Sequence, residues 1–116
     1  MNRMPTARRC ALAGGLSLCL ALSWSFAETP QEDAGRRLYE EKCGMCHAAG
    51  GMGTGLLARR YPPGQELLEQ RSNLTPAFIE VAVRSGIGNM PRISRAEVSD
   101  EQLALISRYL SRQATP

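Results

Sequence analysis

Three segments of the chain repeat apolar residues at the spacing of an α-helix. The first runs from about Asp33 to Lys42 and places Leu38 and Tyr39 on or near one side. Gly35 precedes Tyr39 by four residues, so this face has room for a close helix crossing. No alternation of apolar and polar residues is long enough to predict a strand, so the expected fold class is all-α.

The other two predicted helices carry recognisable first residues. Thr75 followed by Pro76 predicts an N-cap and the first helical position, and Gly86 predicts the end of that helix. Ser99 and Gln102 can form a capping box, which predicts the start of a third helix. The apolar residues at helical spacing are Phe78, Ile79, Ala82 and Val83 in the second helix and Leu103, Ile106 and Leu110 in the third.

The segments between these helices predict no further long element. Residues 48–55 are rich in glycine and are interpreted as a loop, whereas residues 65–70 have room for one or two helical turns. Arg92 to Val98 is a connection whose conformation the sequence does not predict. Because the sequence contains no repeat and no internal linker, we expect one small domain.

The first 27 residues have the pattern of a secretory signal peptide. Three arginines precede the apolar run from Ala11 to Leu22, and Ser25-Phe26-Ala27 supplies small residues at both cleavage positions. The alternative is an uncleaved anchor, but the apolar run is shorter than the ~20 residues that a membrane span needs. We therefore expect cleavage after Ala27, a mature domain over residues 28–116, a periplasmic location and no stable membrane insertion.

Charge and composition change the picture in two ways. The full chain has 14 Lys plus Arg against 11 Asp plus Glu, and the predicted signal segment holds three of the arginines and none of the acids. The mature net charge is therefore zero, which gives no support for nucleic-acid binding. Only four aromatic residues remain in residues 28–116. A domain of this size with so few large apolar side chains needs a cofactor or another stabilising group to complete its core.

Cys43-Gly44-Met45-Cys46-His47 is a CxxCH motif, the attachment signature of c-type haem. Two residues between the thiols let one helical turn hold the ring edge at two points, and the adjacent His then reaches the iron. The alternatives are a redox dithiol, a half zinc site and a small disulfide, but zinc needs four ligands and residues 28–116 contain two Cys and one His. The motif predicts one haem c, bound covalently through Cys43 and Cys46, with His47 as an iron ligand.

The second axial ligand is expected to be a methionine. Met45 lies inside the attachment motif, and Met52 follows His47 by only five residues, so neither is expected to reach the opposite haem face. Met90 lies 43 residues beyond His47, and Pro91 restricts its backbone to extended conformations. We therefore predict Met90 as the distal ligand. The alternative is that Met90 is an ordinary core residue.

These residues resemble those of class I cytochromes c over almost all of residues 33–111. Cys43, Cys46 and His47 match the family's haem attachment site, and Met90-Pro91 matches its distal ligand and the proline that follows. The helix residues that resemble the family's crossing pairs are Gly35, Tyr39, Tyr109 and Leu110. The resemblance implies a class I cytochrome c fold, with three main helices and loops around one covalently bound haem.

A narrower similarity concerns short periplasmic cytochromes that serve dehydrogenases, including the cytochrome subunits of p-cresol methylhydroxylase. It rests on residues 52–55, the run Val81–Gly86 and the Met90-Pro91 turn, whereas the stretch from Tyr61 to Asn73 is longer here. The resemblance implies a one-electron carrier and not an enzyme. Its partners would be a periplasmic dehydrogenase as donor and a downstream cytochrome or terminal oxidase as acceptor.

Two alternatives to a diffusing carrier stay open. The first is a fixed cytochrome subunit of a flavin or quinoprotein dehydrogenase complex, which a net charge near zero mildly favours because it gives little long-range steering. The second is a haem peroxidase or gas sensor in which Met90 leaves the iron open, although the sequence holds no second His for distal acid–base chemistry. Arg59 and Arg60 are interpreted either as contacts for haem propionates or a partner's acids, or as solvated surface residues.

Overall fold

The computed structural model describes residues 29–114, so the predicted signal segment 1–27 lies outside the described residues. Within this range the chain forms four α-helices and one short 3₁₀ helix, and its β content is a single isolated bridge between Ile87 and Met90. The elements are α1 (Pro30–His47), α2 (Met52–Ala58), η1 (Leu68–Gln70), α3 (Pro76–Ser85) and α4 (Asp100–Ser111). The all-α prediction is confirmed.

The helix α1 is longer at both ends than the sequence predicted. It begins at Pro30 because Thr29 and Glu32 form a capping box and Pro30 occupies the first turn. It ends at His47, where the Ala48 N–H donates to the Gly44 carbonyl. The CxxCH motif is therefore the last helical turn of α1 and not a loop after it.

The predicted start signals of α3 and α4 are confirmed. The Thr75 side chain accepts a hydrogen bond from the Phe78 N–H, and Ser99 and Gln102 form the expected capping box. Gly86 ends α3 with a φ of 76°, a conformation that glycine adopts without strain. On α3 the core takes Ile79 and Val83, whereas Phe78 is 48% exposed.

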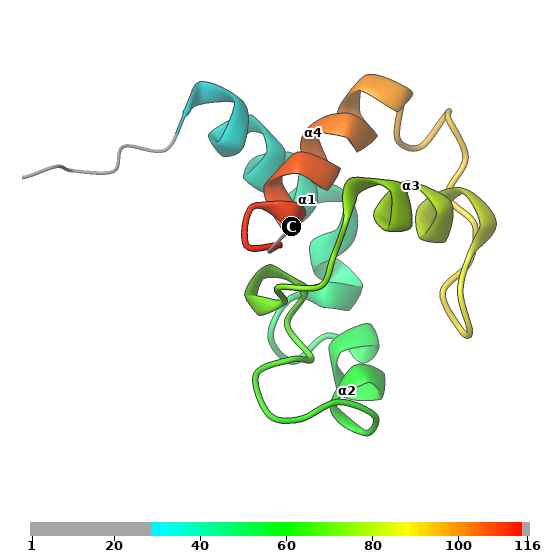
Figure 1. Ribbon diagram of the computed structural model, residues 1–116. Coiled ribbons are helices and arrows are strands. Elements are labelled where there is room, and N and C mark those ends of the chain that lie inside the picture. Colours follow the sequence, from blue (N-terminus) through cyan, green and yellow to red (C-terminus); the bar gives the residue numbers. More distant parts are fainter. Residues whose placement is uncertain (1–28, 115–116) are drawn as a thin grey trace, which may run out of the picture.

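The helices α1 and α4 cross closely at Gly35, and α3 packs beside α4 (Figure 1). A Cβ atom at Gly35 would lie 2.5 Å from the Leu105 carbonyl oxygen and 2.8 Å from the Tyr109 Cβ. The rings of Tyr39 and Tyr109 meet at this crossing with their centroids 5.9 Å apart. The buried apolar core consists of Tyr39, Leu74, Ile79, Val83, Val98, Leu103, Ile106, Tyr109 and Leu110.

The interpretation of residues 48–55 as a loop is wrong for its second half, because Met52–Ala58 is helical. This short helix adds to the three main helices that the sequence predicted, all of which are present as α1, α3 and α4. The Thr54 hydroxyl is buried and donates to the Ala48 carbonyl at 2.9 Å. A Cβ atom at Gly51 or Gly53 would lie 2.5 or 2.9 Å from the Cys46 carbonyl oxygen, so glycine lets this segment pack against the end of α1.

None of the helices between residues 29 and 114 has the length and apolar character needed to cross a bilayer.

Candidate haem attachment site

The two predicted attachment thiols lie one turn apart at the C-terminal end of α1. Cys43 and Cys46 are both free and partly buried, and their spacing of three residues puts them on one side of the helix. Burial raises the pKa of the Cys43 thiol to about 11, and the neighbouring Cys46 adds to this effect. A redox dithiol would need a lowered thiol pKa, so this environment argues against that alternative.

His47 ends the helix with an imidazole that is suited to bind a metal. Burial lowers the pKa of His47, which favours the neutral ring that coordinates metals. Its Nδ1 atom is buried and has no hydrogen-bond partner in residues 29–114. The Tyr39 hydroxyl donates to the His47 carbonyl oxygen at 3.3 Å. A Cβ atom at Gly53 would lie 3.3 Å from the His47 ring, so the ring is held between α1 and α2.

Met90 lies in a tight turn that follows α3. Ile87 and Met90 exchange two backbone hydrogen bonds of 3.1 and 3.0 Å. A Cβ atom at Gly86 would lie 2.8 Å from the Met90 carbonyl oxygen, so this turn needs a glycine there. The Met90 side chain is partly buried and packs against the same core as Cys43. Met90 and the helix α1, which carries the CxxCH motif, therefore pack against the same core.

The other two methionines near the motif have no such packing. Met45 is 91% exposed and Met52 is 73% exposed. Phe78, Val81 and Ile87 are the large apolar side chains exposed on or just after α3. A haem is a large apolar disc, and exposed apolar side chains on the segments that flank the motif and Met90 are what such a disc would cover.

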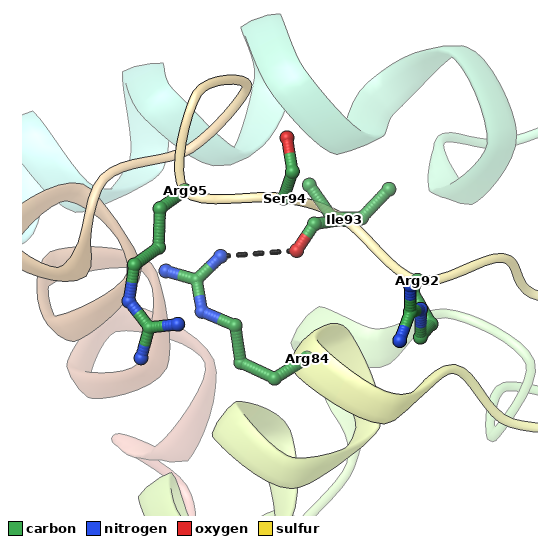
Figure 2. A pocket seen from close by; sticks show the side chains of 5 residues that line it. All are labelled: Arg84, Arg92, Ile93, Ser94 and Arg95. Carbon is green, nitrogen blue, oxygen red and sulfur yellow. Dashed lines mark hydrogen bonds between the residues drawn. The ribbon is translucent and has the colours of Figure 1, made fainter.

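Arg84 fastens the segment that follows Met90 to α3 and α4. Its guanidinium donates to the carbonyl oxygens of Ile93 at 3.1 Å and Val98 at 3.0 Å, and it pairs with Asp100 at 2.8 Å. Figure 2 shows this side chain reaching from α3 to the Ile93 carbonyl, beside the guanidinium of Arg95. The Arg84 side chain is only 18% exposed. No sequence pattern predicts this role, because the partners of Arg84 lie 9 to 16 residues away along the chain.

The alternative of a zinc site is not supported by the arrangement of the side chains. No group of three or more His, Cys, Asp and Glu residues gathers in the described part of the chain. Two half-buried thiols one turn apart and a neutral imidazole with a free buried nitrogen instead match the donors that a c-type haem requires. The residues therefore fit this cofactor.

Arg59 and Arg60 are both exposed at the end of α2. Their exposure fits solvated surface residues and equally fits contacts with a partner's acidic side chains.

Comparisons with known proteins agree with the fold and the motif. The family model described as cytochrome c oxidase, cbb3-type, subunit III matches residues 30–110. The cytochrome c subunit of 4-cresol dehydrogenase [hydroxylating] from Pseudomonas putida is 32% identical over 87 residues, which cover 74% of this chain. The matched region spans 66% of that subunit, just under two thirds of its length. The comparison with solved structures gave no match.

The family match covers α1, α2, η1 and α3 and all but the last residue of α4, and the haem motif stands where the first helix ends. Haem c is the cofactor that this family implies, and electron transfer is its chemistry. The chain therefore belongs to this cytochrome family and is a class I c-type cytochrome, similar to the cytochrome subunit of 4-cresol dehydrogenase.

Proposed function

We propose that the protein is a periplasmic one-electron carrier with a single haem c, attached through Cys43 and Cys46 and ligated by His47 and Met90. The last turn of α1 is the observation that carries the proposal. It presents both thiols on one side of the helix and ends on a neutral imidazole with an unpartnered buried nitrogen. The packing of Met90 against the same core as Cys43 supports the choice of the second ligand.

The bound haem supplies an iron that gains and loses one electron. Cys43 and Cys46 would each add their sulfur and hydrogen across one vinyl double bond, which forms a thioether and needs no oxidant. His47 offers a neutral nitrogen, and Met90 offers a neutral thioether that favours iron(II) and raises the reduction potential. With His47 and Met90 both holding the iron, the protein would pass electrons and would not itself catalyse a reaction on a substrate.

The cofactor and its attachment are tested by mass spectrometry of the protein recovered from the periplasm. We expect the mass of the chain from Glu28 plus one haem, which also tests cleavage after Ala27. Cys43→Ala and Cys46→Ala should each leave one thioether, and the double variant should lose the haem on denaturation. A wild-type protein without covalent haem contradicts the proposal.

The axial ligand is tested by adding carbon monoxide to the reduced protein. The wild type should show no rapid spectral change, because both axial positions are occupied. Met90→Ala should bind carbon monoxide at once, whereas the matched control Met52→Ala, at a 73% exposed side chain, should behave like the wild type. Rapid binding by the wild type would favour an open-site enzyme or gas sensor.

The second candidate function is a fixed cytochrome subunit of a flavin or quinoprotein dehydrogenase. The observation in its favour is that the relative from Pseudomonas putida is named as a subunit of a dehydrogenase. Purification of the tagged, haem-loaded protein from its native periplasm at low salt separates the two functions. A stoichiometric dehydrogenase in the eluate supports the subunit, and the cytochrome alone supports a carrier that diffuses to its donor and its acceptor cytochrome or oxidase.

A further inference from the structure

Two methionines near the haem motif are exposed to water. The Met45 side chain is 91% exposed, and the Met52 side chain is 73% exposed. An apolar side chain stabilises a fold through the area that it buries, so these two side chains contribute little to the core. The packing of residues 29–114 therefore does not explain why a methionine stands at either position.

Exposure sets Met45 and Met52 apart from the other sulfur-bearing side chains. Residues 29–114 contain five side chains with sulfur, and the remaining three, Cys43, Cys46 and Met90, are partly buried. Both Cys43 and Met90 pack against the core. In the described part of the chain, only Met45 and Met52 present a sulfur atom openly to molecules in solution.

The two exposed methionines belong to the same end of the molecule. Met45 lies in the last turn of α1, and Met52 is the first residue of α2, which packs beside that end of α1 (Figure 1). A Cβ atom at residue 51 or 53 would lie 2.5 or 2.9 Å from the Cys46 carbonyl oxygen, so the backbone around Met52 lies against the attachment turn. Residues 43–58 contain no Asp, Glu, Lys or Arg. Both thioethers therefore lie in an uncharged segment next to the attachment site.

A thioether reacts with oxidants that donate an oxygen atom. With a peroxide or a hypohalous acid, an S–O bond forms while the O–O or O–halogen bond breaks. The sulfur loses two electrons, and the oxidant leaves as water or as a halide ion and a proton. The product is methionine sulfoxide, which dedicated reductases convert back to methionine. The reaction needs contact between oxidant and sulfur, so an exposed thioether reacts before one that is packed in a core.

We propose that Met45 and Met52 form an oxidant-reactive site that takes up oxygen from peroxides and hypohalous acids ahead of Met90. The inference rests on the proposed function, since the consequence of this order is that the distal ligand of the haem is preserved. Oxidation of Met90 would turn an apolar side chain of the core into a polar one and remove the thioether that binds iron. Oxidation of Met45 or Met52 changes only a side chain that already lies in water.

The test is a stepwise titration of the haem-loaded protein with hypochlorous acid. The double variant Met45→Leu/Met52→Leu keeps apolar side chains of similar size and removes both exposed thioethers. Because both positions are exposed, we expect this variant to fold and to bind haem like the wild type. The control is Gln113→Leu, which adds a leucine at another exposed position and keeps all three methionines.

Two measurements follow each addition of oxidant. The first is mass spectrometry of tryptic peptides, in which Met90 falls in peptide 85–92 and the other two methionines fall in peptide 43–59. The second is carbon monoxide binding by the reduced protein, which reports loss of the Met90 ligand.

In the wild type we expect sulfoxide first in peptide 43–59, with peptide 85–92 unchanged and no rapid carbon monoxide binding. In the double variant, Met90 sulfoxide and carbon monoxide binding should appear earlier, by about two equivalents of oxidant per chain, one for each exposed thioether removed. The control should follow the wild type.

The inference is overturned if Met90 in the wild type is oxidised together with or before the exposed methionines. It is also overturned if the double variant loses Met90 at the same dose as the wild type, because Met45 and Met52 would then be apolar surface only. Failure of the proposed function gives a different result. The wild type would bind carbon monoxide before any oxidant is added, while the peptides would still report the order of oxidation.

Discussion

The close approach of α1 to α4 at Gly35 makes Gly35→Ala a sharp test of the packing. The new methyl group would lie 2.5 Å from the Leu105 carbonyl oxygen, whereas ordinary contact begins at 3.4 Å. The helices would have to separate by about 0.9 Å to restore it. The atoms that it meets are the Leu105 backbone and the Tyr109 Cβ, so no change of side-chain rotamer can relieve the contact.

The magnitude follows from two opposing effects. Overpacking of a well-packed core costs about 1–3 kcal/mol, and a rigid backbone contact belongs at the upper end of this range. Replacing glycine by alanine inside a helix stabilises the helix by about 1 kcal/mol, which offsets part of this cost. The net loss in the free energy of unfolding is therefore about 2 kcal/mol. At roughly 4–8 °C per kcal/mol for a domain of this size, the melting temperature should fall by about 8–16 °C.

The assay is thermal unfolding of the haem-loaded protein, followed by far-ultraviolet circular dichroism. Gly55→Ala is the matched control, because Gly55 is also helical and a Cβ atom there meets nothing within 4 Å. Its melting temperature should stay equal to that of the wild type or rise. The reasoning is refuted if Gly35→Ala melts at or above the wild-type temperature, or if both variants shift by the same amount.

Three further predictions concern the segment between α3 and α4. Ser99→Ala removes the N-cap of α4 and should cost about 1 kcal/mol in urea unfolding, whereas an unchanged midpoint would contradict the capping role. Arg84→Met removes the hydrogen bonds to the Ile93 and Val98 carbonyls and should loosen the segment that follows Met90, so that the reduced variant binds carbon monoxide while the wild type does not. Equal carbon monoxide binding by the two proteins would show that Arg84 does not hold this segment in place. Hydrogen bonds from Arg95 and Arg84 lower the Asp100 pKa below its usual 3.8, so its stabilising contribution should be lost as the pH falls below about 4. Acid titration of Asp100→Asn, followed by circular dichroism, should show a shallower loss of stability than the wild type, and identical curves would exclude this contribution.

The sequence predicted the features whose interactions are local. Thr75, Gly86 and Ser99 mark helix ends through contacts within four residues, and the structure confirms all three. The CxxCH motif is equally local, because its spacing alone places both thiols on one side of a helical turn. Gly35 was recognised as a crossing point because no larger residue fits such a contact, and the structure confirms this as well.

The predictions from the sequence were wrong where contacts between distant residues override the local conformational preference of the chain. Residues 52–55 belong to the predicted glycine-rich loop, but they form the first part of α2 because glycine lets them lie against the Cys46 carbonyl and the Thr54 hydroxyl donates to the Ala48 carbonyl. The choice of Met90 as a ligand stays a prediction. The sequence could not show that Met90 and Cys43 pack against the same core, because this contact depends on the tertiary structure.

The arginines show most clearly what only the tertiary structure decides. In the sequence Arg59, Arg60, Arg71 and Arg84 are the same residue type with the same formal charge. The fold leaves the first two in water, buries Arg71 against Tyr61 and binds Arg84 to carbonyl groups up to 14 residues away. A residue's chemistry can be read from its neighbours in sequence when its partners lie within one helical turn. Where the partners come from other elements, burial and desolvation set its role, and these exist only once the chain has folded.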